Sequence, residues 1–341
     1  MDRDQIHLQA ALEAVATAAS LTRAVQSGRD DISRHTKDDR SPVTVADYAA
    51  QAIVAMVLSE KLGKRGPLRI VGEESASALR SPEQAPVLDA VVTHIQRWRP
   101  AADVEVVLEA IDACGDDGQS QDFWTLDPVD GTKGFLRGQQ YAIALARIEN
   151  GQVVLGVLGC PNLPQETSAD PAEADPKGTG SLYAAQLGAG TWEFPDADPT
   201  GSPLKMSCPA WTPAAPIRPC ASVESGHSNR GATDDLLDRM ESTSEPVRLD
   251  SQAKYAVLAR GQANAYLRLP TRRDYVEKIW DHAAGALIAS EAGAVVSDVA
   301  GAPLDFRHGR RLEANRGVIA AAAGLHEKLI VASMDLGLQH T

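Results

Sequence analysis

The sequence predicts a layered α+β fold arranged in two lobes, and three observations support this. The chain has 341 residues, whereas single hydrophobic cores stop growing beyond roughly 250–300 residues. Apolar residues make up 43% of the chain and charged residues 23%, which is ordinary for a globular enzyme. In the second half, short apolar runs alternate with helical patterns, and this alternation is typical of stacked helices and sheets.

The N-terminal part is expected to begin with a helix. Leu8, Leu12 and Val15 share one face, and Gly28 is a stop signal. The polar stretch 29–41 carries charges of both signs and is predicted to be an exposed, mobile loop.

A capping box at Thr44 and Asp47 predicts the start of a second helix. A short strand is expected at 68–71, and a helical stretch at 82–121. The core candidates of that stretch are Val91, Ile95, Val107 and Ile111.

A strand at 123–126 and a hairpin at 141–158 are expected next. Asn150-Gly151 lies between two apolar runs, which is a strong hairpin signal. The Pro-, Asp- and Gly-rich piece 161–180 is predicted to be a long loop. We place the lobe boundary there, so that residues 1–165 form an N-terminal α+β lobe and residues 166–341 a C-terminal α/β lobe.

The second half is expected to alternate strand and helix. The predicted strands are 247–249, 265–269, 294–297 and 318–321, and the predicted helices are one from Ser251 and one at 277–291.

Composition limits the partners. The net charge is −13, and binding to a nucleic-acid polymer rests on clustered Lys and Arg. We therefore expect no such polymer as partner. No apolar run approaches the roughly 18 residues that span a bilayer, so no membrane partner is expected.

The compartment is predicted from the cysteines and the first residues. Four widely spaced cysteines form no C-x-x-C pair, which disfavours zinc and favours a reduced, cytoplasmic setting. The first residues lack the pattern of a secretory or transit peptide. An organelle remains open if a transit peptide has been removed.

Three acidic segments follow strand ends or open helices. The run Asp-Pro-Val-Asp-Gly-Thr occupies 127–132, directly after a strand. Glu73-Glu74 also follows a strand, and Asp281 lies near a helix start, where the positive end of the dipole also favours phosphate. Each alone is typical of a turn, a solvated strand end or a helix start. Together they indicate a site for hard cations such as Mg²⁺, which take oxygen ligands.

These segments resemble the lithium-sensitive, magnesium-dependent phosphatase superfamily that includes the inositol monophosphatases. The matching stretches are 72–74, 127–132 and 280–285, and they occur in the family's order. The stretches 41–48, 133–138 and 277–281 look like the 3′(2′),5′-bisphosphate nucleotidase branch. The resemblance spans about residues 8 to 330 and implies a layered αβαβα sugar-phosphatase fold.

The resemblance also implies the ligands of two to three Mg²⁺ ions. Glu73, Asp127 and the carbonyl of Val129 would hold one ion. Asp127, Asp130 and Asp281 would hold a second, and a third, weaker ion would lean on Glu73. Two ions roughly 3.5–4 Å apart stabilise both the attacking and the leaving oxygen of an in-line displacement.

Catalytic roles are implied for Asp47 and Thr132. The family assigns deprotonation of the attacking water to Thr132, helped by Asp47. A hydroxyl is a poor base alone, so a relay to a carboxylate is the better chemical statement.

The implied activity is removal of the 3′-phosphate of adenosine 3′,5′-bisphosphate (PAP), giving AMP, and often also action on its sulfated form PAPS. Lys254 and Arg268 would bind the 5′-phosphate that does not react, one as a point charge and the other as a planar fork. The full set of implied substrate contacts is Gly131, Thr132, His227, Ser251, Lys254, Arg268 and Asp281.

Alternatives remain open. An inositol polyphosphate 1-phosphatase is the nearest, followed by an inositol or sugar monophosphatase. From another class, the protein would be a catalytically silent sensor of PAP or metal, although no implied ligand is replaced by a neutral residue. The expected partner is a small nucleotide bisphosphate, and the expected state is a monomer or weak dimer.

Overall fold

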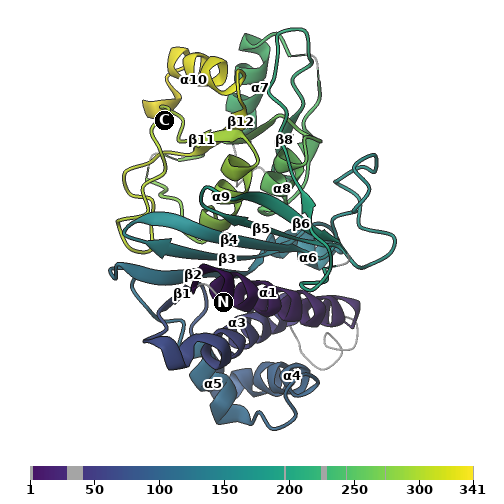
Figure 1. Cartoon of the computed structure of the whole chain (residues 1–341), viewed down its shortest axis with the longest axis vertical. Coiled ribbons are helices and arrows are strands. Elements are labelled where there is room, and N and C mark those ends of the chain that lie inside the picture. The colour runs from purple at the N-terminus through teal and green to yellow at the C-terminus, as the bar shows by residue number, and fades with distance from the viewer. Residues whose placement is uncertain are drawn as a thin grey trace.

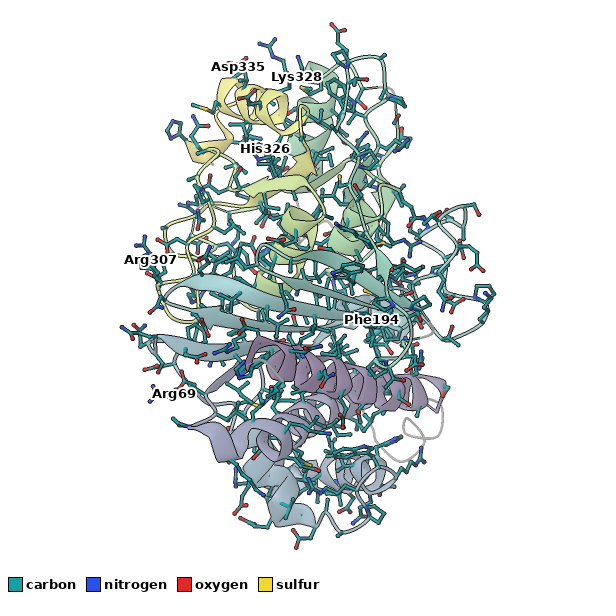
Figure 2. The ribbon with its side chains drawn as sticks, viewed as in Figure 1. Arg69, Phe194, Arg307, His326, Lys328 and Asp335 are labelled. Carbon is teal, nitrogen blue, oxygen red and sulfur yellow. The ribbon has the colours of Figure 1, made fainter. Side chains whose placement is uncertain are left out.

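The computed structural model describes residues 3–28, 41–195, 197–223, 229–242, 244–272 and 274–340. Helices and sheets alternate in five layers, which Figure 1 shows from bottom to top. Helices α1 and α3 come first, then a seven-stranded sheet, then α8 and α9, then a five-stranded sheet, and last α7 and α10. The αβαβα order that the resemblance implied is therefore confirmed. Figure 2 shows the side chains that fill the spaces between these layers.

The first layer contains α1 (Arg3–Ser27) and α3 (Ser41–Leu62), and α4 (Ala85–Gln96) and α5 (Val104–Asp112) cover its outer side. The predicted capping box is wrong, because α3 already begins at Ser41 and Thr44 and Asp47 lie inside it. Pro42 fits this earlier start, since proline is favoured in the first helical turn. The predicted mobile loop lies almost wholly outside the described residues.

The stretch expected to be helical from 82 to 121 holds two helices instead of one. Asp103 begins the second, because its side chain accepts the Val106 N–H at 2.9 Å. The four core candidates of this stretch are buried as predicted. Four short 3₁₀ turns occur in the described chain, at Gly63–Arg65, Ala78–Arg80, Pro82–Gln84 and Leu338–His340.

The first sheet follows chain order from β1 to β7. Its strands are β1 (Ile70–Gly72), β2 (Asp122–Asp130), β3 (Ala142–Glu149), β4 (Gln152–Cys160), β5 (Ser181–Gln186), β6 (Gly190–Pro195) and β7 (Leu204–Lys205). Only β1 and β2 are parallel; the other neighbours are antiparallel. The predicted hairpin is confirmed as β3–β4, and Asn150 and Gly151 have the positive φ angles, 52° and 78°, that its turn requires.

The second sheet has the order β11-β12-β10-β8-β9. Its strands are β8 (Pro219–Ala221), β9 (Val247–Arg248), β10 (Ala265–Arg268), β11 (Ala294–Ser297) and β12 (Val318–Ala322). The remaining helices are α6 (Thr132–Arg137), α7 (Arg230–Arg239), α8 (Ala253–Ala259), α9 (Ala283–Glu291) and α10 (His326–Asp335). The helix expected at 277–291 begins only at Ala283, so Asp281 precedes it.

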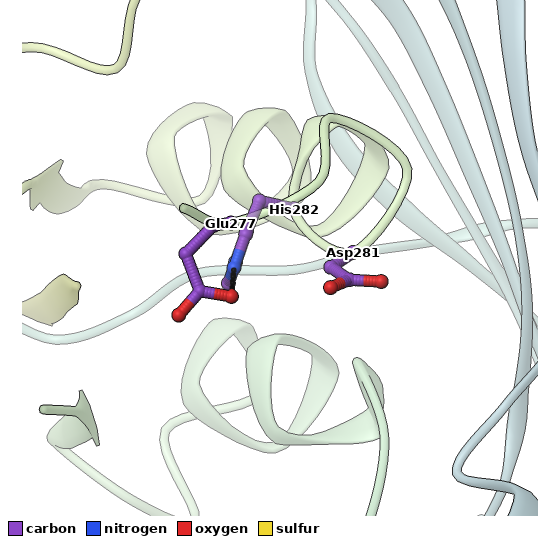
Figure 3. A group of neighbouring side chains, drawn as sticks. All are labelled: Glu277, Asp281 and His282. Carbon is purple, nitrogen blue, oxygen red and sulfur yellow. Dashed lines mark hydrogen bonds and ion pairs between the residues drawn. The ribbon is translucent and has the colours of Figure 1, made fainter. Parts of the chain in front are cut away.

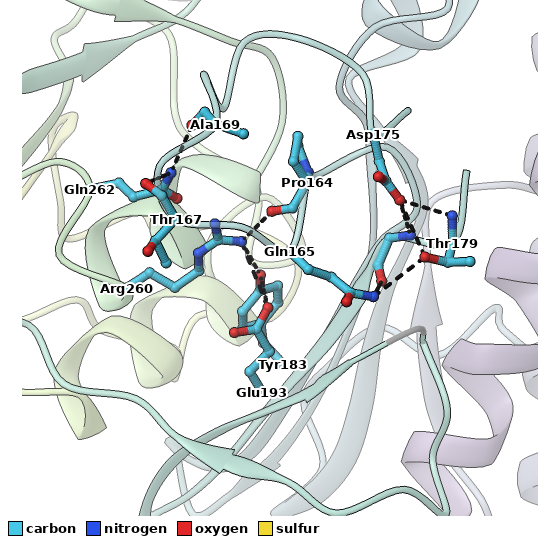
Figure 4. A network of polar contacts seen from close by, with 11 residues as sticks. Pro164, Gln165, Thr167, Ala169, Asp175, Thr179, Tyr183, Glu193, Arg260 and Gln262 are labelled. Atoms are coloured by element: carbon cyan, nitrogen blue, oxygen red, sulfur yellow. Dashed lines mark hydrogen bonds and ion pairs between the residues drawn. The ribbon is translucent and has the colours of Figure 1, made fainter. Parts of the chain in front are cut away.

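The segment 161–180 contains no helix or strand, as predicted, but polar contacts hold it to the body (Figure 4). Arg260 Nη1 donates to Pro164 O and to the Tyr183 hydroxyl, each at 2.8 Å. Gln262 Nε2 donates to Thr167 O at 2.9 Å. Strands β4 and β5, on either side of this segment, pair within one sheet. The first sheet thus continues beyond residue 165, and the division into lobes there stays a prediction.

Helix α3 corrects the expectation about apolar runs. Residues Pro42–Leu62 form a helix long and apolar enough to cross a membrane by length and composition, with a mean hydropathy of 1.4. However, 83% of the 18-residue stretch of this helix to which that hydropathy refers is buried inside the protein. Helix α3 is therefore a core helix, which packs against α1, α4, α5 and strand β2.

Candidate active site

Two of the acidic segments meet where β1 ends beside its parallel neighbour β2, which runs on to Asp130. Gly72 is paired with Leu126, so Glu73 and Asp127, the next residues, emerge side by side. The two side chains are close enough that Asp127 acts on the pKa of Glu73, in the lowering direction. Carboxyl ends of parallel strands are a common location for ligand sites, and this edge of the sheet positions two predicted metal ligands.

A β-bulge brings Asp130 to the same edge. Asp127 pairs with Ala144 and Asp130 with Ala142, so β2 uses one residue more than β3 between these pairs. Pro128 fits the bulge because it has no N–H to donate to the ladder. The extra residue lets two carboxylates three positions apart approach one site.

Gln252 ties Asp130 to the segment that carries Asp281. Its backbone N–H donates to Asp130 Oδ2 at 2.5 Å. Its side-chain Nε2 donates to Trp280 O at 2.8 Å, and its Oε1 accepts the Gly285 N–H at 3.1 Å. Sequence reasoning gave Gln252 no role, because its three contacts are all remote in the chain.

Asp47 approaches the cluster from α3. Its side chain is buried, and burial raises its pKa well above the usual range, with Glu74 and Glu73 acting in the same direction. One turn later, Gln51 fixes the backbone of Glu74 through two bonds, accepting its N–H at 3.0 Å and donating to its carbonyl at 2.8 Å. Helix α3 therefore positions both Asp47 and the Glu73–Glu74 turn.

The cluster carries more negative charge than its surroundings compensate. Burial raises the pKa of Asp127 well above its usual range, and Glu73, Asp130 and other nearby carboxylates add to the effect. Glu73 lies on the solvent-exposed side, but crowding by protein atoms raises its pKa to about 7, with Glu74 and Asp130 as further causes. Burial likewise raises the pKa of Asp281, against the opposing effect of Arg268.

Asp127 shows most directly that a cation fits here. Its side chain is only 3% exposed, and its Oδ1 atom is buried without a hydrogen-bond partner among the described residues. A buried carboxylate oxygen is costly unless it is paired or coordinates a metal. The convergent oxygen ligands are of the kind that hard divalent cations take. The cluster could therefore bind a metal ion.

The tightest group of possible ligands in the described chain is a different one. Single ligand atoms of Glu277, Asp281 and His282 all lie within 4.8 Å of one another (Figure 3). Both carboxylate oxygens of Glu277 accept hydrogen bonds from Arg268. Arg268 Nε donates to Oε1 at 3.1 Å, and Arg268 Nη2 donates to Oε2 at 2.8 Å. His282 lies between Glu277 Oε2, at 3.3 Å, and the Tyr255 hydroxyl, at 2.9 Å.

Because these contacts occupy Glu277 and His282, we assign them to the support of Arg268. Only Asp281 of the three was expected to be a ligand, and its carboxylate lies apart from the other two in Figure 3. Glu277 belongs to the stretch 277–281 that carries part of the resemblance, but no role was predicted for it.

A small cavity of about 20 Å³ adjoins the acidic cluster. It is lined by Asp130, Gly131, Ser222, Ser251, Gln252, Lys254, Tyr266, Arg268 and Asp281. The structure thus brings together five of the predicted substrate contacts: Gly131, Ser251, Lys254, Arg268 and Asp281. Ser222, Gln252 and Tyr266 were missed.

Lys254 is the more deeply buried of the two cations beside this cavity. It is 2% exposed, its Nζ donates to Leu249 O at 3.2 Å and lies 5.3 Å from the centroid of the Tyr266 ring. Burial lowers its pKa, while Asp130 and Asp250 oppose this. Ser251, next to it, has a φ of 69°, a strained conformation that is common at ligand sites.

The remaining predicted residues are placed less completely. Thr132 is the exposed first residue of α6, and Gly131 before it has a φ of 90°, which suits glycine. Val129 is buried in the bulge. His227 lies outside the described residues.

Known proteins agree with this arrangement. The inositol monophosphatase family matches residues 4–336. A Schizosaccharomyces pombe protein named 3′(2′),5′-bisphosphate nucleotidase is 40% identical, and the alignment covers 95% of this chain and 94% of the relative. An Oryza sativa protein of the same name is 39% identical, with 96% and 93% covered.

A solved structure supports the fold alone, because its sequence identity is low. The inositol monophosphatase from Anabaena sp. PCC 7120 is 17% identical, with a TM-score of 0.63, and the alignment covers 98% of this chain and 97% of that one. Sequence motifs, layer order and near-complete alignments thus agree, and the chain belongs to the inositol monophosphatase family of phosphatases.

Proposed function

We propose that this chain is a magnesium-dependent 3′(2′),5′-bisphosphate nucleotidase that hydrolyses the 3′-phosphate of PAP and releases AMP. The observation that carries the proposal is the Asp127 oxygen that has no hydrogen-bond partner among the described residues, in a carboxylate cluster that adjoins a cavity lined by Lys254 and Arg268. The names of the 38–40% identical relatives support the same activity.

Two to three Mg²⁺ ions would be held by the oxygen ligands Glu73, Asp127, Val129 O, Asp130 and Asp281. When bound, such ions polarise the phosphoryl oxygens and lower the pKa of water. The chain itself supplies the proton path. Thr132 would receive the proton of the attacking water and pass it to Asp47, whose pKa is already raised by its burial.

Lys254 and Arg268 would bind the 5′-phosphate. Both lie on the cavity beside Asp281, so the phosphate that does not react would orient the one that does. Glu277 holds Arg268 by two hydrogen bonds, which fixes the guanidinium before substrate arrives. The other proposed substrate contacts are Gly131, Thr132 and Ser251. His227, which lies outside the described residues, is proposed as a further contact.

The proposal extends to properties shared by the branch. We expect PAPS to be a second substrate, lithium to inhibit at millimolar or lower concentration, and calcium not to replace magnesium. Mg²⁺ requires near-octahedral ligands at about 2.0–2.1 Å, whereas Ca²⁺ coordinates at longer distances and more loosely. A cytoplasmic monomer or weak dimer is the proposed state.

A phosphate-release panel tests the activity. PAP, PAPS, 3′-AMP, inositol 1,4-bisphosphate, inositol 1-phosphate and fructose 1,6-bisphosphate would be compared with Mg²⁺, with Ca²⁺, with LiCl and with chelator. Mg²⁺-dependent preference for PAP supports the proposal. Preference for an inositol phosphate would favour the polyphosphate 1-phosphatase or monophosphatase alternatives. PAP binding without turnover at high Mg²⁺ would favour a sensor.

A further inference from the structure

Arg310 lies between the two segments that carry Glu73 and Asp281. It comes from the stretch between β11 and β12, remote in sequence from both. Its Nη2 donates to Gly72 O at 2.6 Å, and Gly72 immediately precedes Glu73. Its Nη1 donates to Asp116 O at 3.0 Å. One side of the guanidinium therefore holds the end of strand β1.

The same guanidinium contacts the residue before Asp281. Its Cζ lies 4.8 Å from the centroid of the Trp280 ring, within the range of a cation–π contact. The backbone strengthens this link, because the Ile279 N–H donates to Arg310 O at 3.3 Å and the Leu312 N–H to Glu277 O at 2.9 Å. Arg310 is thus connected to both ligand-bearing segments.

The position of these segments matters because they come from different layers. Glu73 follows a strand of the first sheet, whereas Asp281 precedes helix α9, between the sheets. Mg²⁺ tolerates little departure from ideal ligand distances. A shift of one segment against the other would separate the carboxylates, and a misplacement of about 1 Å can cost a hundredfold in rate.

We infer that Arg310 is a positioning residue that sets the separation of Glu73 and Asp281 for a divalent cation. The inference rests on the proposed function insofar as the cluster binds Mg²⁺. Lysine is not equivalent to arginine here, because a single ammonium cannot offer the planar fork to two carbonyls while it stacks on an indole.

Arg311 provides a matched control. It is the next residue and exposed, its Nη1 donates to Val276 O at 3.4 Å, and its charge acts on Lys278 as that of Arg310 does. Arg311→Ala therefore removes the same charge from nearly the same place but leaves Gly72 and Trp280 in contact with Arg310.

The experiment is calorimetric titration of full-length, chelator-treated protein with MgCl₂, alongside phosphate release from PAP as a function of Mg²⁺. We expect Arg310→Ala to weaken Mg²⁺ binding at least tenfold, Arg310→Lys to fall between it and the wild type, and Arg311→Ala to stay within twofold. At saturating Mg²⁺, the rate of phosphate release by Arg310→Ala should come within a few fold of the wild-type rate. The Mg²⁺ concentration that gives half of this rate should be higher than for the wild type.

The outcomes separate the inference from the proposed function. Unchanged Mg²⁺ affinity in a folded Arg310→Ala protein overturns the inference. If the alanine variant does not fold, unchanged Mg²⁺ affinity in Arg310→Lys overturns it. Mg²⁺ binding that depends on Arg310, without turnover of PAP, overturns the proposed function alone. A wild type that binds no Mg²⁺ overturns both.

Discussion

Arg268 and Glu277 form a two-point ion pair behind the cavity, with N–O distances of 3.1 and 2.8 Å. The two side chains are 14% and 7% exposed. Asp281 lies near the same guanidinium nitrogen, with its Oδ2 3.9 Å from Arg268 Nη2. One arginine thus links a buried supporting carboxylate to a proposed metal ligand, and its substitution would disturb both.

Lys254 gives the cleaner test of substrate specificity, because it has no carboxylate partner of this kind among its described contacts. Lys254→Met keeps an apolar stem and removes the charge. We expect kcat/KM for PAP to fall roughly ten- to a hundredfold, as for the loss of one charge-assisted hydrogen bond. The loss for 3′-AMP should be much smaller, since that substrate has no 5′-phosphate.

In Arg268→Ala, kcat/KM should likewise fall much more for PAP than for 3′-AMP. Arg268→Lys should restore only part of the lost kcat/KM. The double variant Arg268→Ala/Glu277→Gln serves as control, because it does not leave a buried carboxylate unpaired. Equal losses on PAP and 3′-AMP in these variants would mean that the two cations are structural.

Glu277 predicts a pH dependence of stability. Burial raises its pKa, but Arg268 and His282 outweigh burial and bring it to about 2, below the ordinary value of 4.5. A depressed folded-state pKa means that the stabilisation is complete above pH 4.5 and is lost as the pH falls toward 2. Glu277→Gln should therefore lower the free energy of unfolding by about 3 kcal/mol at pH 7.

This difference between wild type and Glu277→Gln should shrink steadily from pH 5 to pH 3. Urea unfolding at several pH values, in chelator, measures it. Glu313→Gln, at an exposed position, should stay near the wild type throughout. A difference that is the same at pH 7 and pH 3 would contradict the assignment.

Asp127→Asn should abolish most of the activity without lowering the stability of the fold. It removes one charge from a crowded cluster and supplies an amide where an oxygen has no hydrogen-bond partner in the described part of the chain. We expect phosphate release to fall about 10³-fold or more. In chelator, the melting temperature should equal or exceed that of the wild type, since active-site strain is relieved.

The rise in melting temperature on adding Mg²⁺ should be lost in Asp127→Asn. Asp235→Asn, an exposed change on α7, removes the same charge far from the cluster and should keep the Mg²⁺-induced rise. An undiminished rise in Asp127→Asn would show that the ion binds elsewhere.

Thr132→Ala should lower kcat with little change in KM, because the hydroxyl is proposed to act on the attacking water and not to hold substrate. The measurement is steady-state kinetics on PAP at saturating Mg²⁺. A raised KM with unchanged kcat would assign Thr132 to binding.

Asp47→Asn should show the same kinetic pattern. The observed start of α3 at Ser41 sharpens this test, since Asp47 is not part of a helix cap. Its replacement should therefore not cost the roughly 1 kcal/mol expected for a lost cap. A thermal melt in chelator checks this, and a marked loss of stability would leave the fall in kcat open to a structural cause.

Local signals account for what the sequence predicted. Asn150-Gly151 predicts the β3–β4 hairpin because its turn needs two positive φ angles. The acidic segments were predicted because they follow apolar strands, and the structure places Glu73 directly after β1 but Asp127 still inside its neighbour β2, which runs on to Asp130. The start of α3 was misplaced because two start signals, Pro42 and the Thr44 box, compete within one turn.

The residues that were missed act through contacts distant in the chain. Gln252 and Arg310 have no local motif, and their partners lie many residues away; Glu277 lies in a stretch that the resemblance includes, but its pairing with Arg268 depends on the fold. Strands β5 to β7 follow a loop whose composition suggested a boundary, yet they extend the first sheet. Periodicity within a segment cannot report which sheet that segment joins.

The proposed ligands come from both halves of the sequence, at positions 73, 127, 130 and 281. A fragment that contains all four must run at least from residue 73 to residue 281. An ion that they share can bind fully only when the end of β1, the bulge of β2 and the segment before α9 are in place, so its binding would stabilise only a chain in which these segments have assembled. At a free Mg²⁺ concentration of 100 times the dissociation constant, this coupling adds about 2.7 kcal/mol to the folded state. The supply of magnesium would then govern how long the protein survives, and not only how fast it works.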